Sequence, residues 1–119
     1  MTTLIACLST GKGTWGHVGK LINSKKFEKV ILVCNQWSKD NYQNEKGAEM
    51  VIIDGYKPLE ENLAILEPTL KEKVTDTEVA LNMVSGSGSE HMAVLSALLK
   101  LGVGIRLVVA GDGDEVKEL

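Results

Sequence analysis

Residues 79–89 read VALNMVSGSGS, an apolar stretch of strand-forming residues that passes directly into a loop of serine and glycine. The next residues, 90–101, carry apolar side chains at helical spacing. The same order recurs near the start of the chain, where residues 3–8 (TLIACL) precede a glycine-rich loop over residues 9–16 and a helical pattern over residues 15–25. Two strand–loop–helix units of this kind predict a fold in which strands alternate with helices.

Three further apolar stretches are predicted strands, at residues 30–34, 50–53 and 105–110. A helix is expected over residues 59–70, with Pro58 in its first turn and a kink or break at Pro68. Residues 35–47 are polar and indicate a loop that could hold a short helix. Gly102 follows the last helical pattern and is the expected C-cap of that helix.

Strands that are apolar on both faces imply a parallel sheet with helices on each side. Right-handed crossovers then favour an α/β, Rossmann-like, doubly wound fold with about five parallel strands in the order 3-2-1-4-5. The chain is therefore expected to form one domain over residues 1–110, followed by an acidic C-terminal tail over residues 111–119. As an alternative, the tail could continue into an effector domain of a longer chain.

Composition narrows the range of partners. The 119 residues are 44% hydrophobic and 24% charged, with a net charge of −3, which is ordinary for a soluble domain. The absence of a long apolar segment and of a signal peptide predicts a cytoplasmic protein with no membrane partner. A single arginine, Arg106, argues against duplex nucleic acid and favours a small anionic ligand. Cys7 and Cys34 form no CxxC pair and are predicted to be buried structural thiols, so we expect no metal and no cofactor.

The predicted strand order places the two glycine-rich loops at one site. Strands 1 and 4 are neighbours in the order 3-2-1-4-5, and ligands bind beyond the carboxyl ends of the strands at such a switch point. Each loop leads into a helix N-terminus, which favours a phosphate, and Trp15 or Trp37 could stack on a base. The residues expected to bind the ligand are Ser9, Thr10, Gly11, Gly13, Thr14, Trp15, Ser85, Gly86, Ser87, Gly88 and Ser89.

Other interpretations of these loops stay open. Residues 11–16 (GKGTWG) match the G-x-G-x-x-G pattern of a NAD-type dinucleotide site, but such a site needs an acid at the end of strand 2, where Asn35 stands. A Walker P-loop fails because His17 and Val18 follow the loop instead of lysine and serine or threonine. Both loops could also be plain strand-to-helix turns, the second with Ser89 as N-cap.

Residues 82–92 (NMVSGSGSEHM), which continue into AVLSALLKLGV, resemble the strand-4 motif of CARF domains, the CRISPR-associated Rossmann-fold sensors. Residues 7–14 (CLSTGKGT) resemble the strand-1 loop of the same family. The family usually carries Lys or Arg just after the loop threonine, where this chain has Glu90 and His91. The resemblance implies that the protein binds a cyclic oligoadenylate, a second messenger of CRISPR antiviral defence, at the junction of a homodimer.

Some members of that family also cleave the ring, with a 2′-hydroxyl as nucleophile and without a metal, so the resemblance leaves ring nuclease activity open. Lys12 is the only cation in either loop and is a candidate to stabilise the charge that develops on the phosphorus. His17 and His91 lie just beyond the two loops and are candidates for proton transfer. If the lysine is merely solvated and the histidines only form local hydrogen bonds, the protein is a non-catalytic sensor domain.

Overall fold

The computed structural model describes residues 3–8, 12–44 and 46–119. The elements follow in the order β1 (Thr3–Leu8), the 3₁₀ turn η1 (Lys12–Thr14), α1 (Trp15–Asn23), β2 (Lys29–Cys34), α2 (Gln36–Asn41), β3 (Glu49–Ile52), α3 (Leu59–Lys73), β4 (Glu78–Asn82), α4 (Gly88–Leu101), β5 (Gly104–Ala110) and β6 (Val116–Glu118). This alternation of strands and helices is the one that the sequence pattern predicts.

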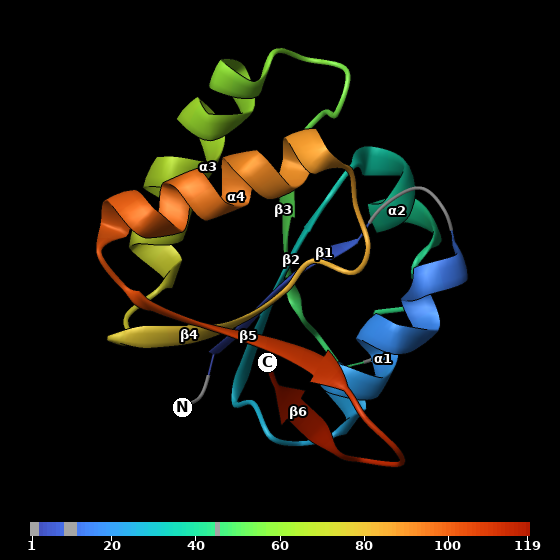
Figure 1. Cartoon of the computed structure of the whole chain (residues 1–119). Helices are drawn as coiled ribbons and strands as arrows, with labels where there is room; N and C mark the ends of the chain where they lie inside the picture. The colour runs from blue at the N-terminus through green and yellow to red at the C-terminus, as the bar shows by residue number, and fades with distance from the viewer. Residues whose placement is uncertain (1–2, 9–11, 45) are drawn as a thin grey trace.

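The sheet has the order β3-β2-β1-β4-β5-β6 (Figure 1). The pairs from β3 to β5 are parallel, which confirms the predicted doubly wound α/β fold and its order 3-2-1-4-5. The strand β6 was not predicted: residues 116–118, inside the segment expected to be an acidic tail, pair antiparallel with β5. Gly113 adopts a φ of 57° between these strands, a left-handed conformation that permits the tight reversal.

Helices cover both faces of the sheet, as predicted. Figure 1 shows α3 and α4 together on one side and α1 and α2 on the other. Side chains of β1 alternate between the two cores: Ile5 and Cys7 belong to the core under α3 and α4, and Leu4 and Ala6 belong to the core under α1. All residues of β1 are buried, because β1 is the central strand and has helices on both sides.

The helix boundaries correct three details of the sequence prediction. The expected break at Pro68 is absent, since α3 runs without interruption from Leu59 to Lys73. Pro68 is exposed while Leu66 and Leu70 are fully buried, so packing of the inner face holds the helix despite the missing N–H donor. The helix α4 begins at Gly88 with Ser87 as its N-cap, not at residue 90 with Ser89 as N-cap.

Two other expectations about the helices are confirmed. Gly102 is the C-cap of α4 with a φ of 75°. The short helix α2 forms after β2, because the Asn35 side chain accepts a hydrogen bond from the Ser38 N–H (2.8 Å) and so caps it.

Within the described part of the chain, every helix falls short of the length and apolar character that a membrane span requires.

Candidate functional site

The carboxyl ends of β1 and β4 lie side by side at one edge of the sheet. Parallel pairing of Leu4 with Ala80 and of Ala6 with Asn82 fixes this arrangement. The two glycine-rich loops therefore leave neighbouring strands in the same direction, as the switch-point argument requires. Of the predicted ligand-binding residues in the first loop, Ser9, Thr10 and Gly11 lie outside the described residues, and the side chain of Lys12 also lies outside the description.

The described end of the first loop is open. Thr14 is the N-cap of α1 but its side chain makes no capping hydrogen bond, and the first turn of α1 contains no acid. A Cβ placed on Gly13 or Gly16 would come within 4 Å of none of the residues that the structure describes, apart from the adjacent residues and the helix's own backbone. The N-terminus of α1 therefore has neither a side-chain cap nor a negative charge of its own, which suits an anionic group.

Trp15, another predicted ligand-binding residue, is packed against other aromatic rings. Its ring centroid lies 5.7 Å from that of Trp37 and 5.5 Å from that of Tyr42. These contacts join α1 to α2 and leave Trp15 half-buried. Trp37 is 42% exposed as a residue and is therefore the more accessible of the two for stacking.

The turn after β4 is closed and tightly packed. Gly86 has a φ of 101°, and a Cβ there would come within 3.1 Å of both the Cys7 Cβ and the His91 Nε2 atoms. The same His91 Nε2 lies 2.8 Å from the carbonyl oxygen of the buried Ser85, to which it donates a hydrogen bond. His91 was predicted to transfer protons. Its hydrogen bond to Ser85 instead gives it a structural role, because the bond stabilises the turn.

A capping box closes the N-terminus of α4. The Ser87 N–H donates to Glu90 Oε1 (2.8 Å), and the Glu90 N–H donates to Ser87 Oγ (3.2 Å). The Glu90 side chain is buried, with 6% of the residue exposed. The predicted phosphate site at Gly88 and Ser89 therefore has a carboxylate beside it, which already interacts with the positive end of the helix dipole.

His17, the third predicted catalytic residue, connects α1 with the ends of β4 and β5. Its Nε2 atom accepts a hydrogen bond from the Ala110 N–H (3.3 Å) and lies 3.1 Å from Asn82 Nδ2. Asn82 is buried, and its Nδ2 also donates to the Val108 carbonyl oxygen (2.8 Å). A structural partner for each histidine fits the alternative of local hydrogen bonding, and proton transfer by either one stays a prediction.

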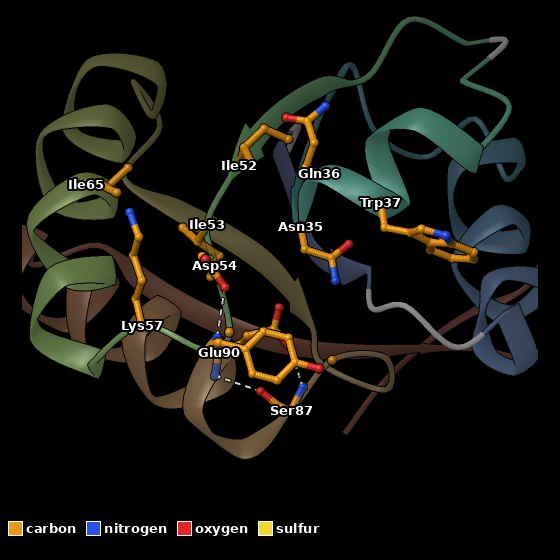
Figure 2. Close-up of a pocket in the computed structure, with 13 residues that line it drawn as sticks. Asn35, Gln36, Trp37, Ile52, Ile53, Asp54, Lys57, Ile65, Ser87 and Glu90 are labelled. Carbon is orange, nitrogen blue, oxygen red and sulfur yellow. Dashed lines mark hydrogen bonds between the residues drawn. The ribbon is translucent and has the colours of Figure 1, made fainter.

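A cavity of about 850 Å³ opens beside these turns, at the carboxyl ends of β2 and β3 (Figure 2). It is large enough for a nucleotide-sized ligand. Its lining consists of Asn35, Gln36, Trp37, Ile52, Ile53, Asp54, Gly55, Tyr56, Lys57, Ile65, Gly86, Ser87 and Glu90. Of these, the sequence had indicated only Gly86 and Ser87 as loop ligands and Trp37 as a stacking residue.

The segment after β3 contributes a fixed polar wall to this cavity. Asn62 of α3 is buried, and its side chain accepts from the Asp54 N–H (3.2 Å) and donates to the Asp54 carbonyl oxygen (2.7 Å). The Asp54 side chain in turn accepts from the Tyr56 N–H (2.9 Å). Apolar side chains such as Ile53 and Ile65 complete the lining. The wall is therefore held in place before any ligand arrives.

The two cysteines lie next to the site but are not accessible groups. Both are free and buried, which confirms the prediction of structural thiols. Burial, together with the nearby Glu90 carboxylate, raises the pKa of Cys7 to about 12 and that of Cys34 to about 11. In the described ranges, no cluster of three or more histidine, cysteine, aspartate or glutamate side chains is arranged to hold a metal ion.

Among solved structures, the chain is similar to Csm6 from Enterococcus italicus bound to cyclic hexa-2′-fluoro-hexa-dAMP, with a TM-score of 0.62 and 13% sequence identity. The similarity covers 91% of this chain and 32% of the Csm6 chain. No model of a known protein family and no curated protein sequence matches the chain. At this level of identity the similarity confirms the CARF-like, Rossmann-type fold that the two loop motifs indicated, and the fold alone.

Proposed function

We propose that this protein binds a cyclic oligoadenylate at the junction of a homodimer, as a CARF-like sensor in CRISPR antiviral defence. One observation carries the proposal: a nucleotide-sized cavity of about 850 Å³ adjoins the β4–α4 turn, whose sequence resembles the CARF motif. The fold similarity supports it, because the Csm6 chain was solved with a cyclic hexanucleotide analogue. The buried free thiols suit a reducing compartment, and we place the protein in the cytoplasm.

In this proposal the bases and the phosphates occupy different parts of the sheet edge. A base enters the cavity and stacks on the exposed ring of Trp37. Phosphates lie over the turn before α1, where Gly13 and Thr14 belong to the 3₁₀ turn η1 that leads into the helix and Lys12 supplies a positive charge. Ser9, Thr10 and Gly11 extend the same loop and are proposed to contact the ring as well.

The outer face of α4 supports the homodimer. Met92 and Leu99 are 60% and 64% exposed, and with Leu95 and Ser96 they line a shallow depression on this face. The opposite face of α4 is buried in the core, and the outer face carries these exposed apolar side chains together with Lys100, which also lines the depression. Exposed apolar side chains that are grouped in this way are typical of a surface that a partner covers. A second copy that packs on this face about a two-fold axis would bring a second β4–α4 turn to the same ring.

Binding without cleavage is the form of the function that the geometry favours. The predicted proton-transfer groups His17 and His91 both use Nε2 in hydrogen bonds that hold the turns together. Cleavage by Lys12, His17 and His91 is the second candidate, with the 2′-hydroxyl of the ring as nucleophile. Product analysis separates the two forms.

The decisive experiment is calorimetric titration of the protein with cyclic tetra-adenylate and cyclic hexa-adenylate in EDTA, with chromatography of the mixtures for linear products. We expect binding of at least one ring, weakened by Trp37→Ala and by Lys12→Ala but not by Lys46→Ala, which changes an exposed lysine on another loop. Linear product that disappears in Lys12→Ala would establish the ring nuclease. Absence of binding to both rings, or tighter binding of NAD, would contradict the proposal.

The dimer has its own test, by sedimentation velocity with and without the ring. We expect a dimer that Leu99→Lys converts to a monomer. Leu119→Lys is the matched control, because Leu119 is 79% exposed and lies on the strand edge instead of on α4. A wild-type protein that stays monomeric at micromolar concentration in both states would contradict the homodimer.

A further inference from the structure

Two carboxylates from distant parts of the chain line the proposed base cavity. Glu90 comes from the first turn of α4, and Asp54 follows β3. The turn that carries Asp54 lies over the Glu90 side chain, since a Cβ on Gly55 would come within 4.0 Å of the Glu90 Cδ atom. Figure 2 labels Asp54 and Glu90 among the residues that line the cavity. Lys57 is the one cation among the described residues of the lining.

Both carboxylates are held in fixed orientations by the backbone. Glu90 Oε1 accepts from the Ser87 N–H (2.8 Å), and Asp54 Oδ1 accepts from the Tyr56 N–H (2.9 Å). Each of these bonds engages one carboxylate oxygen, and a carboxylate has a second oxygen that can only accept. Both residues line the cavity, so its wall contains hydrogen-bond acceptors that are oriented by backbone contacts.

The two carboxylates disfavour the binding of a phosphate in the cavity and favour the binding of a hydrogen-bond donor. A phosphate in the cavity would face two like charges, one on the exposed Asp54 and one on the buried Glu90, and salt screens the buried charge less than the exposed one. An exocyclic amino group would instead find acceptors already in position. Glu90 also exerts its charge on the neighbouring core, because its carboxylate contributes to the raised pKa of Cys7 and of Cys34.

We propose that Asp54 and Glu90 read the amino group of adenine in the cavity and keep phosphate out of it, so that the phosphates of the ring bind over the α1 turn. This inference rests on the proposed function, because it takes a cyclic oligoadenylate as the ligand. A base with an oxygen in place of the amino group would place an acceptor against these acceptors and lose the hydrogen bonds that adenine makes. Asp54 and Glu90 are thus the residues that determine base specificity.

The test compares cyclic hexa-adenylate with the cyclic hexa-inosine ring, which has the same phosphates and lacks the amino groups. We expect the wild-type protein to bind the adenine ring more tightly by about tenfold or more, equivalent to one lost hydrogen bond to a charged group. Asp54→Asn introduces an amide N–H donor and should reduce that preference by about tenfold, through both weaker adenine and tighter inosine binding. Glu60→Gln, on the exposed start of α3, is the matched control and should change neither affinity.

Glu90→Gln separates the two roles of the second carboxylate. Its amide oxygen can still accept from the Ser87 N–H, so the capping box and the fold are retained. Removal of the charge should lower the preference for adenine and should raise the affinity for free AMP more than for adenosine. Equal binding of the two rings, or a preference that survives both Asp54→Asn and Glu90→Gln, overturns this inference and leaves the proposed function intact. Failure of both rings to bind overturns the proposed function itself.

Discussion

The turn from β1 into α1 and the turn from β4 into α4 leave neighbouring strands at the same edge of the sheet, yet they are built differently. The first has no side-chain cap and no acid in the following helical turn, and among the described residues none crowds a Cβ placed on Gly13 or Gly16. The second has a capping box, a buried glutamate and a glycine, Gly86, in contact with Cys7 and His91. The first turn leaves the N-terminus of α1 available to an anion. In the second turn, the capping box already provides hydrogen-bond partners at the N-terminus of α4.

The difference shows why two similar glycine-rich sequences need not share a function. A helix N-terminus attracts phosphate only while its dipole and N–H groups are not already compensated. Glu90 provides that compensation on α4, and no acid provides it on α1. The β4–α4 turn is therefore better suited to shape a base cavity than to hold a phosphate. The predictions below test this contrast between a closed turn and an open one.

The largest effect is expected for Gly86→Ala in the closed turn. The substitution would force a side chain into a φ of 101° and against Cys7 and His91 at 3.1 Å. We expect the free energy of unfolding to fall by about 2–3 kcal/mol, from backbone strain together with steric overlap. Gly88→Ala, two residues later with no neighbour within 4 Å, should change it by no more than about 0.5 kcal/mol. Urea denaturation measures both, and equal losses would contradict the packing described for Gly86.

The next effect concerns the two helix caps. Ser87→Ala removes a hydroxyl that accepts from the Glu90 N–H, and it should cost about 1 kcal/mol of stability. Thr14→Ala, at the corresponding position of the open turn, removes a side chain that makes no capping bond and should cost less than about 0.3 kcal/mol. Thermal denaturation of the two variants gives the comparison. A larger loss for Thr14→Ala would mean that α1 is the better capped helix.

The closed turn also predicts a loss of stability in alkali. Cys7, which contacts Gly86, has a pKa raised from 9.0 to about 12 in the folded protein, mainly by burial. Because the unfolded chain releases this proton more easily, the stabilising contribution is complete below pH 9 and is lost as the pH rises towards 12. Between pH 9 and pH 10 the wild type should lose about 1 kcal/mol more than Cys7→Ala. If the free energy of unfolding of the two proteins changed equally with pH, the predicted role of the Cys7 thiol would be contradicted.

The smallest effect is expected in the open turn and has the opposite sign. Gly16→Ala places a methyl group where no atom lies within 4 Å, inside the first turn of α1. It should stabilise the protein by about 0.5 kcal/mol, because alanine loses less backbone entropy than glycine in a helix. Chemical denaturation without ligand measures the gain. A loss of stability would indicate that this turn is more tightly packed than the described contacts imply.

Much of the fold could be predicted because its strands are apolar on both faces, a pattern that specifies a covered parallel sheet. The strand β6 could not be predicted in this way. It has three residues, of which only Val116 is apolar and packs on the core, so no alternation marks it. The continuation of α3 through Pro68 depends on tertiary packing of Leu66 and Leu70, which local propensity does not contain.

The cavity lies at the sheet edge that the switch-point argument indicates, but most of its lining was not predicted. The cavity joins segments after β2, β3 and β4, and its position depends on side chains that meet only in the folded chain. One signal was present in the sequence: residues 87–90 (SGSE) follow the S-x-x-E pattern of a capping box and would have identified Ser87 as the N-cap. The hydrogen bond of His17 with Ala110 could not be predicted from the sequence, because the two residues are far apart in the chain.

The central position of β1 has a consequence for how the chain acquires its structure. Residues of β1 pair on one side with β2, which follows soon after, and on the other side with β4, where Leu4 meets Ala80. During synthesis from the N-terminus, β1 can pair with β2 early, but it can pair with β4 only after most of the chain has been made. Closure of such a long loop is slow, so we expect the β1–β4 pairing to be a late step of folding, and the carboxyl edge with both turns to form only then.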